Sequence, residues 1–295
     1  MTGGTGFIGS RLLDRAAEAR HTVRALARRA MRPRRGVTWI DGALDQPESL
    51  AALVQGSDAV IHIAGLLNGR TKAQFDAVNV DGTAAVARAA REAGIRRFVH
   101  VSSLAARHPE ISLYGASKAE SEKLVEQSGL DFAIVRPPAV YGPGDKETFD
   151  LFRMAKYRLA LLPSNGRLSL IHVDDLADLL LALVGPGAPS SLIVEPDDGA
   201  SLTQREFAGK LGAAFGHRNL AIRVPKFALR AGAAIDGLVR RGRATLTPDR
   251  AAYFAHEDWA ADPRRAVPQS LWKPRISADQ GLRATAHWYR DHGWL

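Results

Sequence analysis

A tyrosine and a lysine four residues apart, Tyr114 and Lys118, could together move a proton. On a helix, side chains at this spacing share one face. A tyrosine hydroxyl alone is a poor base at neutral pH, because its ordinary pKa is about 10. A neighbouring ammonium group favours the phenolate and lowers that pKa. The pair could then give or take a proton at a carbonyl or alcohol oxygen.

Two adjacent serines, Ser102 and Ser103, come shortly before this pair. Either hydroxyl could hydrogen-bond a substrate oxygen and stabilise the charge that develops on it. Counting along the strand expected to start at Phe98 favours Ser103 as the third catalytic residue, with Ser102 as the alternative. A purely structural role is also open, in which a serine at a strand end satisfies backbone groups.

Glycines near the start of the chain indicate a nucleotide-binding loop, and an apolar, helix-forming run follows at 10–19. Such spacing lets the chain leave a strand in a sharp turn and approach a pyrophosphate closely. The amino end of the next helix then faces the phosphates. The residues expected to bind the cofactor here are Gly3, Thr5, Gly6, Phe7, Ile8 and Gly9.

The elements that must position these residues alternate along the first half of the chain. Apolar runs predict strands at 21–27, 37–40, 59–64, 97–102 and 132–135, and helical patterns lie at about 10–19, 47–55, 72–93 and 114–128. Strands alternating with helices predict an α/β fold, a Rossmann doubly wound parallel sheet with helices on both faces.

One strand of this pattern is missing, because only Met1 precedes Thr2 at the glycine loop. In a doubly wound sheet that first strand is central, and without it two neighbouring strands would keep unpaired backbone groups. We therefore expect the natural start to lie a few residues upstream of Met1.

The pattern changes after Arg136, where a cluster of prolines and glycines interrupts the alternation. We predict a dinucleotide-binding Rossmann domain at 1–141, joined by residues from about 171 to 184. The remaining residues, 142–170 and 185–295, are predicted to form a smaller mixed α/β C-terminal substrate region.

The composition excludes several kinds of site. The 295 residues include no cysteine, so disulfides and cysteine nucleophiles are excluded. No apolar run reaches the roughly 20 residues that span a bilayer, and Arg11 and Asp14 interrupt any signal-peptide pattern. We expect a cytoplasmic protein without stable membrane insertion. Despite the net charge of +9, the scattered arginines predict no nucleic-acid partner. His172 has no second histidine at ligand spacing, so we predict no metal site.

Taken together, these motifs resemble the short-chain dehydrogenase/reductase superfamily, extended type, which is epimerase/dehydratase-like. The resemblance covers nearly the whole chain. It is carried by Thr2-Gly3-x-x-Gly6-x-x-Gly9, residues 58–65, Asn79-Val80-x-Gly82-Thr83, Val101-Ser102-Ser103, Tyr114-x-x-x-Lys118, Arg136-Pro137, residues 141–145 and 171–177, and Trp288-Tyr289.

The resemblance implies roles for individual residues. Tyr114 would be the acid/base, and Lys118 would also bind the nicotinamide ribose. Asn79 lies where the family has an asparagine that supports a proton-relay water, although a solvent-facing polar residue fits the sequence almost as well. His172 would join the two regions structurally. The resemblance also leaves a homodimer open.

The preferred cofactor is NADP, with NAD as the alternative. Arg28 and Arg29 follow the strand at 21–27, which is the second of the fold when the missing first strand is counted. NAD-preferring relatives carry an acidic residue at this place. A guanidinium fork suits the 2′-phosphate of NADP. Leu44 could pack against the adenine ring. The resemblance adds four further cofactor-binding positions, Ala64, Gly65, Pro137 and Val140. Residues Arg32, Arg34 and Arg35 are expected to be solvated.

The segment 226–243 is apolar over much of its surface and ends in arginines. It could lie on a membrane surface or cover an apolar substrate, but a helix packed on the substrate region is the favoured interpretation. The tryptophans near the end of the chain are expected to pack rather than to bind ligand.

Three functions compete. The first is an oxidoreductase that transfers hydride between NADP(H) and a carbonyl or secondary alcohol of a small organic substrate. The second is a nucleotide-sugar epimerase or dehydratase, but Leu104 and Ala105 replace the acidic pair of dehydratases and Ala139 replaces the asparagine usual in sugar-nucleotide enzymes. The third is a non-catalytic nucleotide-binding relative, which the presence of Tyr114 and Lys118 disfavours.

Overall fold

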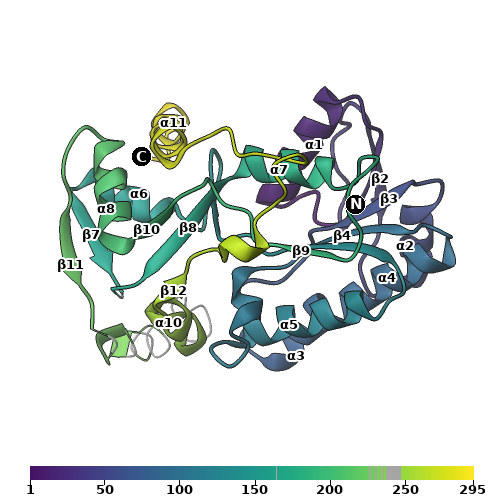
Figure 1. Ribbon diagram of the computed structural model, residues 1–295, viewed down its shortest axis with the longest axis horizontal. Coiled ribbons are helices and arrows are strands. Elements are labelled where there is room, and N and C mark those ends of the chain that lie inside the picture. Colours follow the sequence, from purple (N-terminus) through teal and green to yellow (C-terminus); the bar gives the residue numbers. More distant parts are fainter. Residues whose placement is uncertain (164, 226, 230, 233, 235, 237–246) are drawn as a thin grey trace. The chain divides into compact units, whose positions relative to one another are not determined.

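A parallel sheet with helices on both faces forms the first of two units in the computed structural model (Figure 1). The structure describes residues 1–163, 165–225, 227–229, 231–232, 234, 236 and 247–295. The first unit comprises Met1–Pro137, Val173–Pro196 and Pro263–Lys273, and the second comprises Pro138–His172, Asp197–Asp262 and Pro274–Leu295.

The first unit contains most of the predicted elements. Its strands are β1 (Val23–Ala27), β2 (Val37–Asp41), β3 (Ala59–His62), β4 (Arg97–Val101), β5 (Asp131–Val135) and β9 (Leu192–Val194). Its helices are α1 (Phe7–Glu18), α2 (Pro47–Val54), α3 (Lys72–Phe75), α4 (Gly82–Glu92), α5 (Leu113–Glu126) and α7 (Val173–Ala182), with a π-helical segment at Asp76–Asp81 and 3-10 turns at Leu104–Arg107 and Pro263–Arg265.

Every strand pair of this sheet is parallel, and β3, β4, β5 and β9 are neighbours in that order. Strands β1 and β2 form a second pair. Met1 and Thr2 lie between β1 and β3: Leu26 N donates to Met1 O at 3.1 Å, and Thr2 N donates to Ile61 O at 3.1 Å. The predicted doubly wound α/β fold is confirmed, with two residues in the place of its central strand.

The amino group of Met1 is consequently buried in the sheet, where it donates to Arg24 O. Burial, with a smaller contribution from the charge of Arg24, lowers the pKa of this amino group from 8.0 to about 5.

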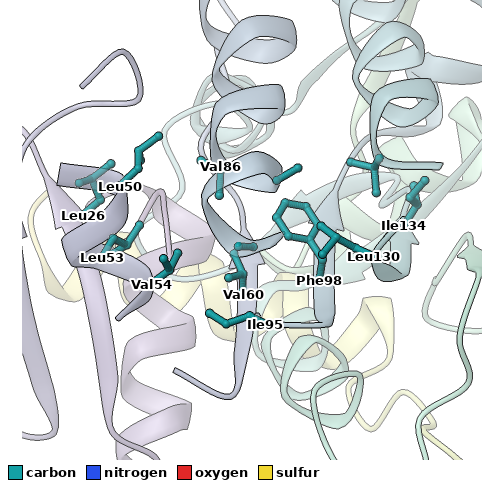
Figure 2. Close-up of a cluster of buried hydrophobic side chains, with 13 residues drawn as sticks. Leu26, Leu50, Leu53, Val54, Val60, Val86, Ile95, Phe98, Leu130 and Ile134 are labelled. Carbon is teal, nitrogen blue, oxygen red and sulfur yellow. The ribbon is translucent and has the colours of Figure 1, made fainter. Parts of the chain in front are cut away.

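Helices cover both faces of the sheet, with α1 and α7 on one face and α2, α4 and α5 on the other (Figure 1). Two ion pairs join α1 to α7: Arg15 Nε lies 2.7 Å from Asp178 Oδ1, and Arg11 pairs with Asp174. On the other face, leucines of α2 and Val86 of α4 pack with Phe98 of β4 (Figure 2). Apolar strand residues on both faces explain why these runs lack an alternating pattern.

The second unit is a mixed structure of short strands and helices. Its strands are β6 (Ala139–Tyr141), β7 (Leu159–Leu162), β8 (Arg167–His172), β10 (Ser201–Thr203), β11 (Leu220–Arg223) and β12 (Asp258–Trp259), and its helices are α6 (Phe149–Lys156), α8 (Gln204–Ala213), α10 (Pro248–Ala255) and α11 (Ala278–Asp291). Strand β8 pairs with β6, β10 and β12, and β7 pairs with β11.

Aromatic side chains hold the core of the second unit together. Tyr289 of α11 packs edge to face on Phe149 and Phe152, and its hydroxyl donates to Asp145 O at 2.6 Å. Trp288 and Trp294 pack in the same cluster. These two tryptophans therefore have the expected packing role.

The units differ from the predicted regions at four places. Residues 185–196, predicted in the substrate region, belong to the first unit, because β9 pairs with β5. Residues 138–141 and 171–172 belong to the second unit, because β6 pairs with β8. Residues 263–273 belong to the first unit, where Glu195 N donates to Arg265 O at 2.8 Å. That the first unit binds the cofactor and the second the substrate stays a prediction.

The predicted helix at 226–243 lies mostly outside the described residues. Within the described part of the chain, no helix combines the length and the apolar character that crossing a bilayer requires.

Candidate active site

The glycine loop is shaped by two positions that admit no side chain. Gly3 has a φ of +74°, and a Cβ there would lie 2.7 Å from Ala64 N. A Cβ on Gly9 would lie 2.0 Å from Gly3 O, so α1 begins directly against the loop. Both close approaches require glycine.

The first turn of α1 leaves backbone N–H groups for a ligand. Gly6 is the N-cap, is exposed, and supplies no capping side chain. Thr5 is exposed beside it, while Phe7 and Ile8, the first two helical residues, are half-buried. No acidic residue stands in this turn. Unpaired N–H groups and the positive end of the helix dipole fit the diphosphate of a dinucleotide.

The end of β3 lies beside this loop. Ala64 N donates to Thr2 Oγ1 at 3.2 Å. A Cβ on the exposed Gly65 would lie 3.3 Å from the side-chain oxygen of Asn79. Small residues here keep the backbone open at the strand ends, where ligands of doubly wound sheets bind.

Arginines follow β1 where the second strand was predicted to end. Arg28 and Arg29 are exposed, and neither makes an ion pair with any residue that the structure describes. Arg34 is not solvated as expected: its guanidinium donates to Ser10 O at 2.8 Å and pairs with Asp14 of α1. A carboxylate on the neighbouring helix, invisible in the local sequence pattern, accounts for the difference.

Leu44, predicted to lie against adenine, packs on the start of α4. A Cβ on Gly82 would lie 2.8 Å from Leu44 Cδ1. Leu44, in the loop after β2, therefore packs against the start of α4. Its contact with a nucleotide remains a prediction.

The two candidate serines differ in their partners. Ser102 Oγ donates to the buried carboxylate of Glu122. Ser103 caps the 3-10 turn at 104–107, and its Oγ accepts a hydrogen bond from Ala105 N at 3.2 Å. The hydroxyl hydrogen of Ser103 has no acceptor among the described residues, whereas that of Ser102 is committed to Glu122.

Helix α5 carries Tyr114 and Lys118 in its first two turns. Ser112 caps the helix by accepting from Gly115 N at 2.9 Å. A Cβ on Gly115 would lie 2.7 Å from Ala105 O, so the first turn packs directly on the turn that Ser103 begins. The structure therefore places the elements of all three predicted catalytic residues together in the first unit.

Lys118 is only 3 % exposed, and its Nζ donates to Val101 O at 2.8 Å. Desolvation by burial lowers the pKa of this ammonium from 10.5 to about 8, and the charge of Glu122 opposes the shift. Tyr114 is half-buried, and its ring centroid lies 6.3 Å from that of Phe75. Tyr114 and Lys118 thus stand one helical turn apart on α5, the first partly accessible and the second buried.

Asn79 is completely buried, so the solvent-facing alternative is wrong. It lies in the π-helical segment before α4, inside the range predicted as one regular helix. Its amide nitrogen donates to Ser117 Oγ at 2.8 Å and to Leu66 O at 3.0 Å, and its oxygen accepts from Leu66 N at 2.6 Å. Asn79 thus joins α5 to the loop after β3.

A buried ion network behind the serines was missed by the sequence analysis. Glu122 accepts from Ser102 and from Arg136, with Arg136 Nη2 at 2.6 Å. Arg136 also reaches Glu195, which pairs with Arg107 at 3.1 Å. The available signal was spacing: Glu122 stands one helical turn beyond Lys118.

A second missed group is a chain of hydrogen bonds through His62. Its Nδ1 lies 2.7 Å from Thr2 Oγ1 and its Nε2 lies 3.0 Å from Thr83 Oγ1, which donates to Asn79 O at 2.6 Å. His100 stacks on His62 with ring centroids 5.5 Å apart. Burial lowers the pKa of His62 from 6.5 to about 3, with a further contribution from Lys118. The neutral, fully buried ring of His62 thus links Thr2 of the glycine loop to Thr83 of α4.

The remaining predicted residues lie as follows. Pro137 is buried, and its carbonyl accepts from Leu104 N at 3.1 Å. Val140 lies on β6 of the second unit and pairs with Ile171. His172 is buried and meets Tyr141 edge to face at 5.4 Å. No group of three or more histidine, aspartate or glutamate side chains suited to a metal ion occurs in the described ranges.

Residues 1–190 match the family model described as "NAD dependent epimerase/dehydratase family". The chain is 37 % identical over 320 residues to a ceramide reductase of Caulobacter vibrioides, covering 100 % of this chain and 95 % of that protein. It is 30 % identical to 4-hydroxy-2-methyl-3-oxo-4-farnesyl-3,4-dihydroquinoline-1-oxide ketoreductase of Stigmatella aurantiaca, covering 96 % of this chain and 94 % of that protein.

The fold is also similar to solved structures. The Bordetella bronchiseptica enzyme WbmG, in complex with NAD and UDP, superposes with a TM-score of 0.77 at 17 % identity, covering 99 % of this chain and 94 % of that chain. At this identity, the similarity describes the fold alone.

Proposed function

The chain belongs to the NAD dependent epimerase/dehydratase family and is an oxidoreductase of its extended short-chain dehydrogenase/reductase type; from this we propose that it uses NADPH to reduce a ketone of a lipophilic substrate. Tyr114 supplies the proton to the ketone oxygen. The product is the secondary alcohol, and the reverse reaction oxidises that alcohol.

The observation that carries this proposal is the environment of Lys118. Its ammonium is buried at the end of β4 and one helical turn from Tyr114, on the helix that packs against the turn at Ser103. A pKa lowered to about 8 still leaves most of this amine protonated at pH 7. A positive charge in a low-dielectric site lowers the pKa of a neighbouring phenol strongly.

Each residue then has a defined task. The Ser103 hydroxyl donates to the ketone oxygen and stabilises the negative charge that develops there. The Tyr114 hydroxyl transfers its proton to the same oxygen. A bound nicotinamide supplies the hydride that adds to the ketone carbon. Lys118 stabilises the phenolate that remains on Tyr114, which regains a proton from solvent.

The loop geometry supports binding of a dinucleotide, since the cradle at Gly3 and Gly9 is closed to any Cβ. The preference for NADP rests on Arg28 and Arg29. Both are exposed after β1 and have no described anionic partner, so they are available to pair with a 2′-phosphate.

A lipophilic substrate is supported by the two relatives that cover nearly the whole chain. One is a ceramide reductase, and the other reduces a ring that carries a farnesyl group. We propose a long-chain ceramide-type ketone, in which the secondary alcohol of a ceramide is oxidised, as the first substrate to test.

The test is a steady-state assay of nicotinamide oxidation with this ketone and with short water-soluble ketones. We expect turnover with NADPH, a higher KM with NADH, and a higher kcat/KM for the long-chain substrate. Arg28→Ala should raise the KM for NADPH at least about tenfold and leave that for NADH unchanged, because a charged hydrogen bond is lost. Arg35→Ala, which removes an exposed arginine from the other end of the same loop, is the matched control. Equal use of both cofactors by the unmodified enzyme would reject the NADP assignment.

A nucleotide-sugar epimerase is the second candidate, favoured by the description of the family model. The same triad would serve it. Conversion of UDP-glucose without net oxidation of added nicotinamide, together with no turnover of any ketone, would establish this alternative. A non-catalytic protein would bind the dinucleotide but show no turnover in the ketone assay or in the UDP-glucose assay.

A further inference from the structure

The second unit exposes apolar side chains along a two-stranded sheet. Strands β7 and β11 pair in parallel, with Leu159 opposite Leu220 and Leu161 opposite Ile222. These four side chains share one face, because cross-strand partners and residues two apart point the same way. Leu220 is 66 % exposed, and Ile222 and Leu161 are 43 % and 42 % exposed. Figure 1 shows β11 at the left edge of the second unit.

The opposite face of the same two strands is covered. Ala160 and Leu162 are buried against Ala208 of α8, and Ala221 packs on this cluster. The sheet thus has one face in the core of its unit and one apolar face turned to solvent. Two exposed aromatic residues flank the outer face in sequence: Tyr157 immediately before β7 and Phe227 after β11, each 74 % exposed.

The two segments that contain these strands carry positive charges and no negative ones. No aspartate or glutamate occurs at 154–163 or at 214–229. Three exposed basic residues precede the strands, Lys156, Arg158 and Arg218, whereas Arg223 pairs with Leu162 on the opposite face. The ammonium of Lys156 lies 5.7 Å from the centre of the Tyr157 ring. Apolar and aromatic side chains rimmed by lysine and arginine are the composition of surfaces that enter the headgroup layer of a bilayer.

We propose that the apolar face of β7 and β11, with its basic rim, docks on the surface of an anionic membrane. The leucines and the isoleucine enter the interface, and Lys156, Arg158 and Arg218 meet lipid phosphates. A second copy of the chain fits this face poorly. In a two-fold dimer the same patch meets itself, which would bring the two basic rims together without compensating carboxylates.

The proposal is independent of the reaction, and it is tested by binding of the full chain to vesicles. Sedimentation with vesicles of phosphatidylcholine and phosphatidylglycerol is compared with phosphatidylcholine alone, at low and high salt. We expect binding to the anionic vesicles that weakens as salt screens the charges. The double variant Leu220→Ser/Ile222→Ser and the double variant Arg158→Glu/Arg218→Glu should each reduce the bound fraction at least about fivefold.

The matched control is Arg88→Glu/Arg91→Glu, which makes the same change of charge on α4 of the first unit. It should leave most binding intact. The thermal unfolding midpoint of each variant verifies folding without using enzymatic activity. Equal loss in the control and in Arg158→Glu/Arg218→Glu would mean that net charge alone attracts the vesicles, and would overturn the proposal.

Absence of binding to anionic vesicles by the unmodified chain would also overturn it. So would a dimer in light scattering that Leu220→Ser/Ile222→Ser converts to a monomer, because the face would then be an interface between copies. Because no readout here depends on turnover, a failed ketone assay would not affect this test.

Discussion

The charge state of Lys118, the residue proposed to assist Tyr114, depends on the groups that surround it. The spacing of Tyr114 and Lys118 was enough to propose an acid/base pair. The burial that lowers the pKa of Lys118 to about 8 depends on tertiary contacts, among them the hydrogen bond from its Nζ to Val101 O at the end of β4. Desolvation and the carboxylate of Glu122 act on this amine in opposite directions. Two predictions follow from this balance.

Tyr114→Phe should lower kcat by about a hundredfold or more, because the proton donor is removed while the ring remains. Dinucleotide affinity should be unchanged, since no backbone group of the loop is altered. Steady-state kinetics and a fluorescence titration with NADPH measure both. Tyr157→Phe, at an exposed tyrosine of the second unit, is the control and should behave as the unmodified enzyme. Unchanged kcat in Tyr114→Phe would refute the acid/base role.

Glu122→Gln should move the basic limb of the pH–rate profile to lower pH by about half a unit or more. The carboxylate favours the protonated form of Lys118, so its removal lowers the pKa of that amine further. A purely structural effect would lower activity at every pH without moving the limb.

Glu120→Gln is the matched control on the same helix, because Glu120 is exposed and pairs only with Lys123 among the described residues. It should leave the profile where it is. If the profile of Glu122→Gln also stays in place, Glu122 has no electrostatic role at the site.

At the scale of elements, the site depends on close backbone approaches. Helix α1 touches its own preceding loop at Gly9, and α5 touches the turn after β4 at Gly115. The π-helical segment turns Asn79 inward, where it joins two of these elements. Such contacts leave no space for a methyl group.

Gly9→Ala should therefore destabilise the protein by about 1–3 kcal/mol, the usual cost of forcing extra atoms into a packed region. It should also weaken NADPH binding at least about tenfold, because Gly3 must move to relieve the clash with its carbonyl oxygen. Urea unfolding and fluorescence titration measure the two effects. Gly209→Ala on α8 is the control: a Cβ there meets nothing within 4 Å. It should stabilise the helix by about 0.5–1 kcal/mol.

At the scale of the whole molecule, the interior of the first unit holds two histidines in their neutral form. His62 and His100 are fully buried, and burial lowers the pKa of both below 6.5. The charge of Lys118 lowers the pKa of His62 further. The unfolded chain protonates these histidines near pH 6.5, whereas the folded chain does not.

Stability should consequently fall as the pH drops below about 6.5, since the unfolded state then binds more protons. With a folded pKa of about 3, His62 alone should cost about 2 kcal/mol at about pH 5. Urea unfolding between about pH 7.5 and 5 measures the slope, and NMR of the imidazole rings tests its origin. His287→Gln, at an exposed histidine, should keep the slope. Titration of the His62 ring near pH 6.5 in the folded protein would contradict the explanation.

Much of the fold follows from local pattern. Apolar runs between helical segments predicted the doubly wound sheet, and the structure has strands at or within a few residues of each predicted position. Periodicity and glycine spacing determine these features, because each reflects only the path of its own segment. The strand at 37–40 and the helix at 47–55 show this most directly: they are observed at Val37–Asp41 and Pro47–Val54.

The tertiary structure decided what depends on distant partners. It committed Ser102 to Glu122, bound Arg34 to Asp14, buried Asn79, and stacked His62 on His100. Residues 20 to 38 positions apart meet in these contacts, so no local period or spacing reports them. The same holds for the outer face of β7 and β11, whose exposure depends on which elements pack against the pair. By itself, the sequence determined the order of elements and the residue types capable of chemistry, and three-dimensional packing determined their partners, burial and charge.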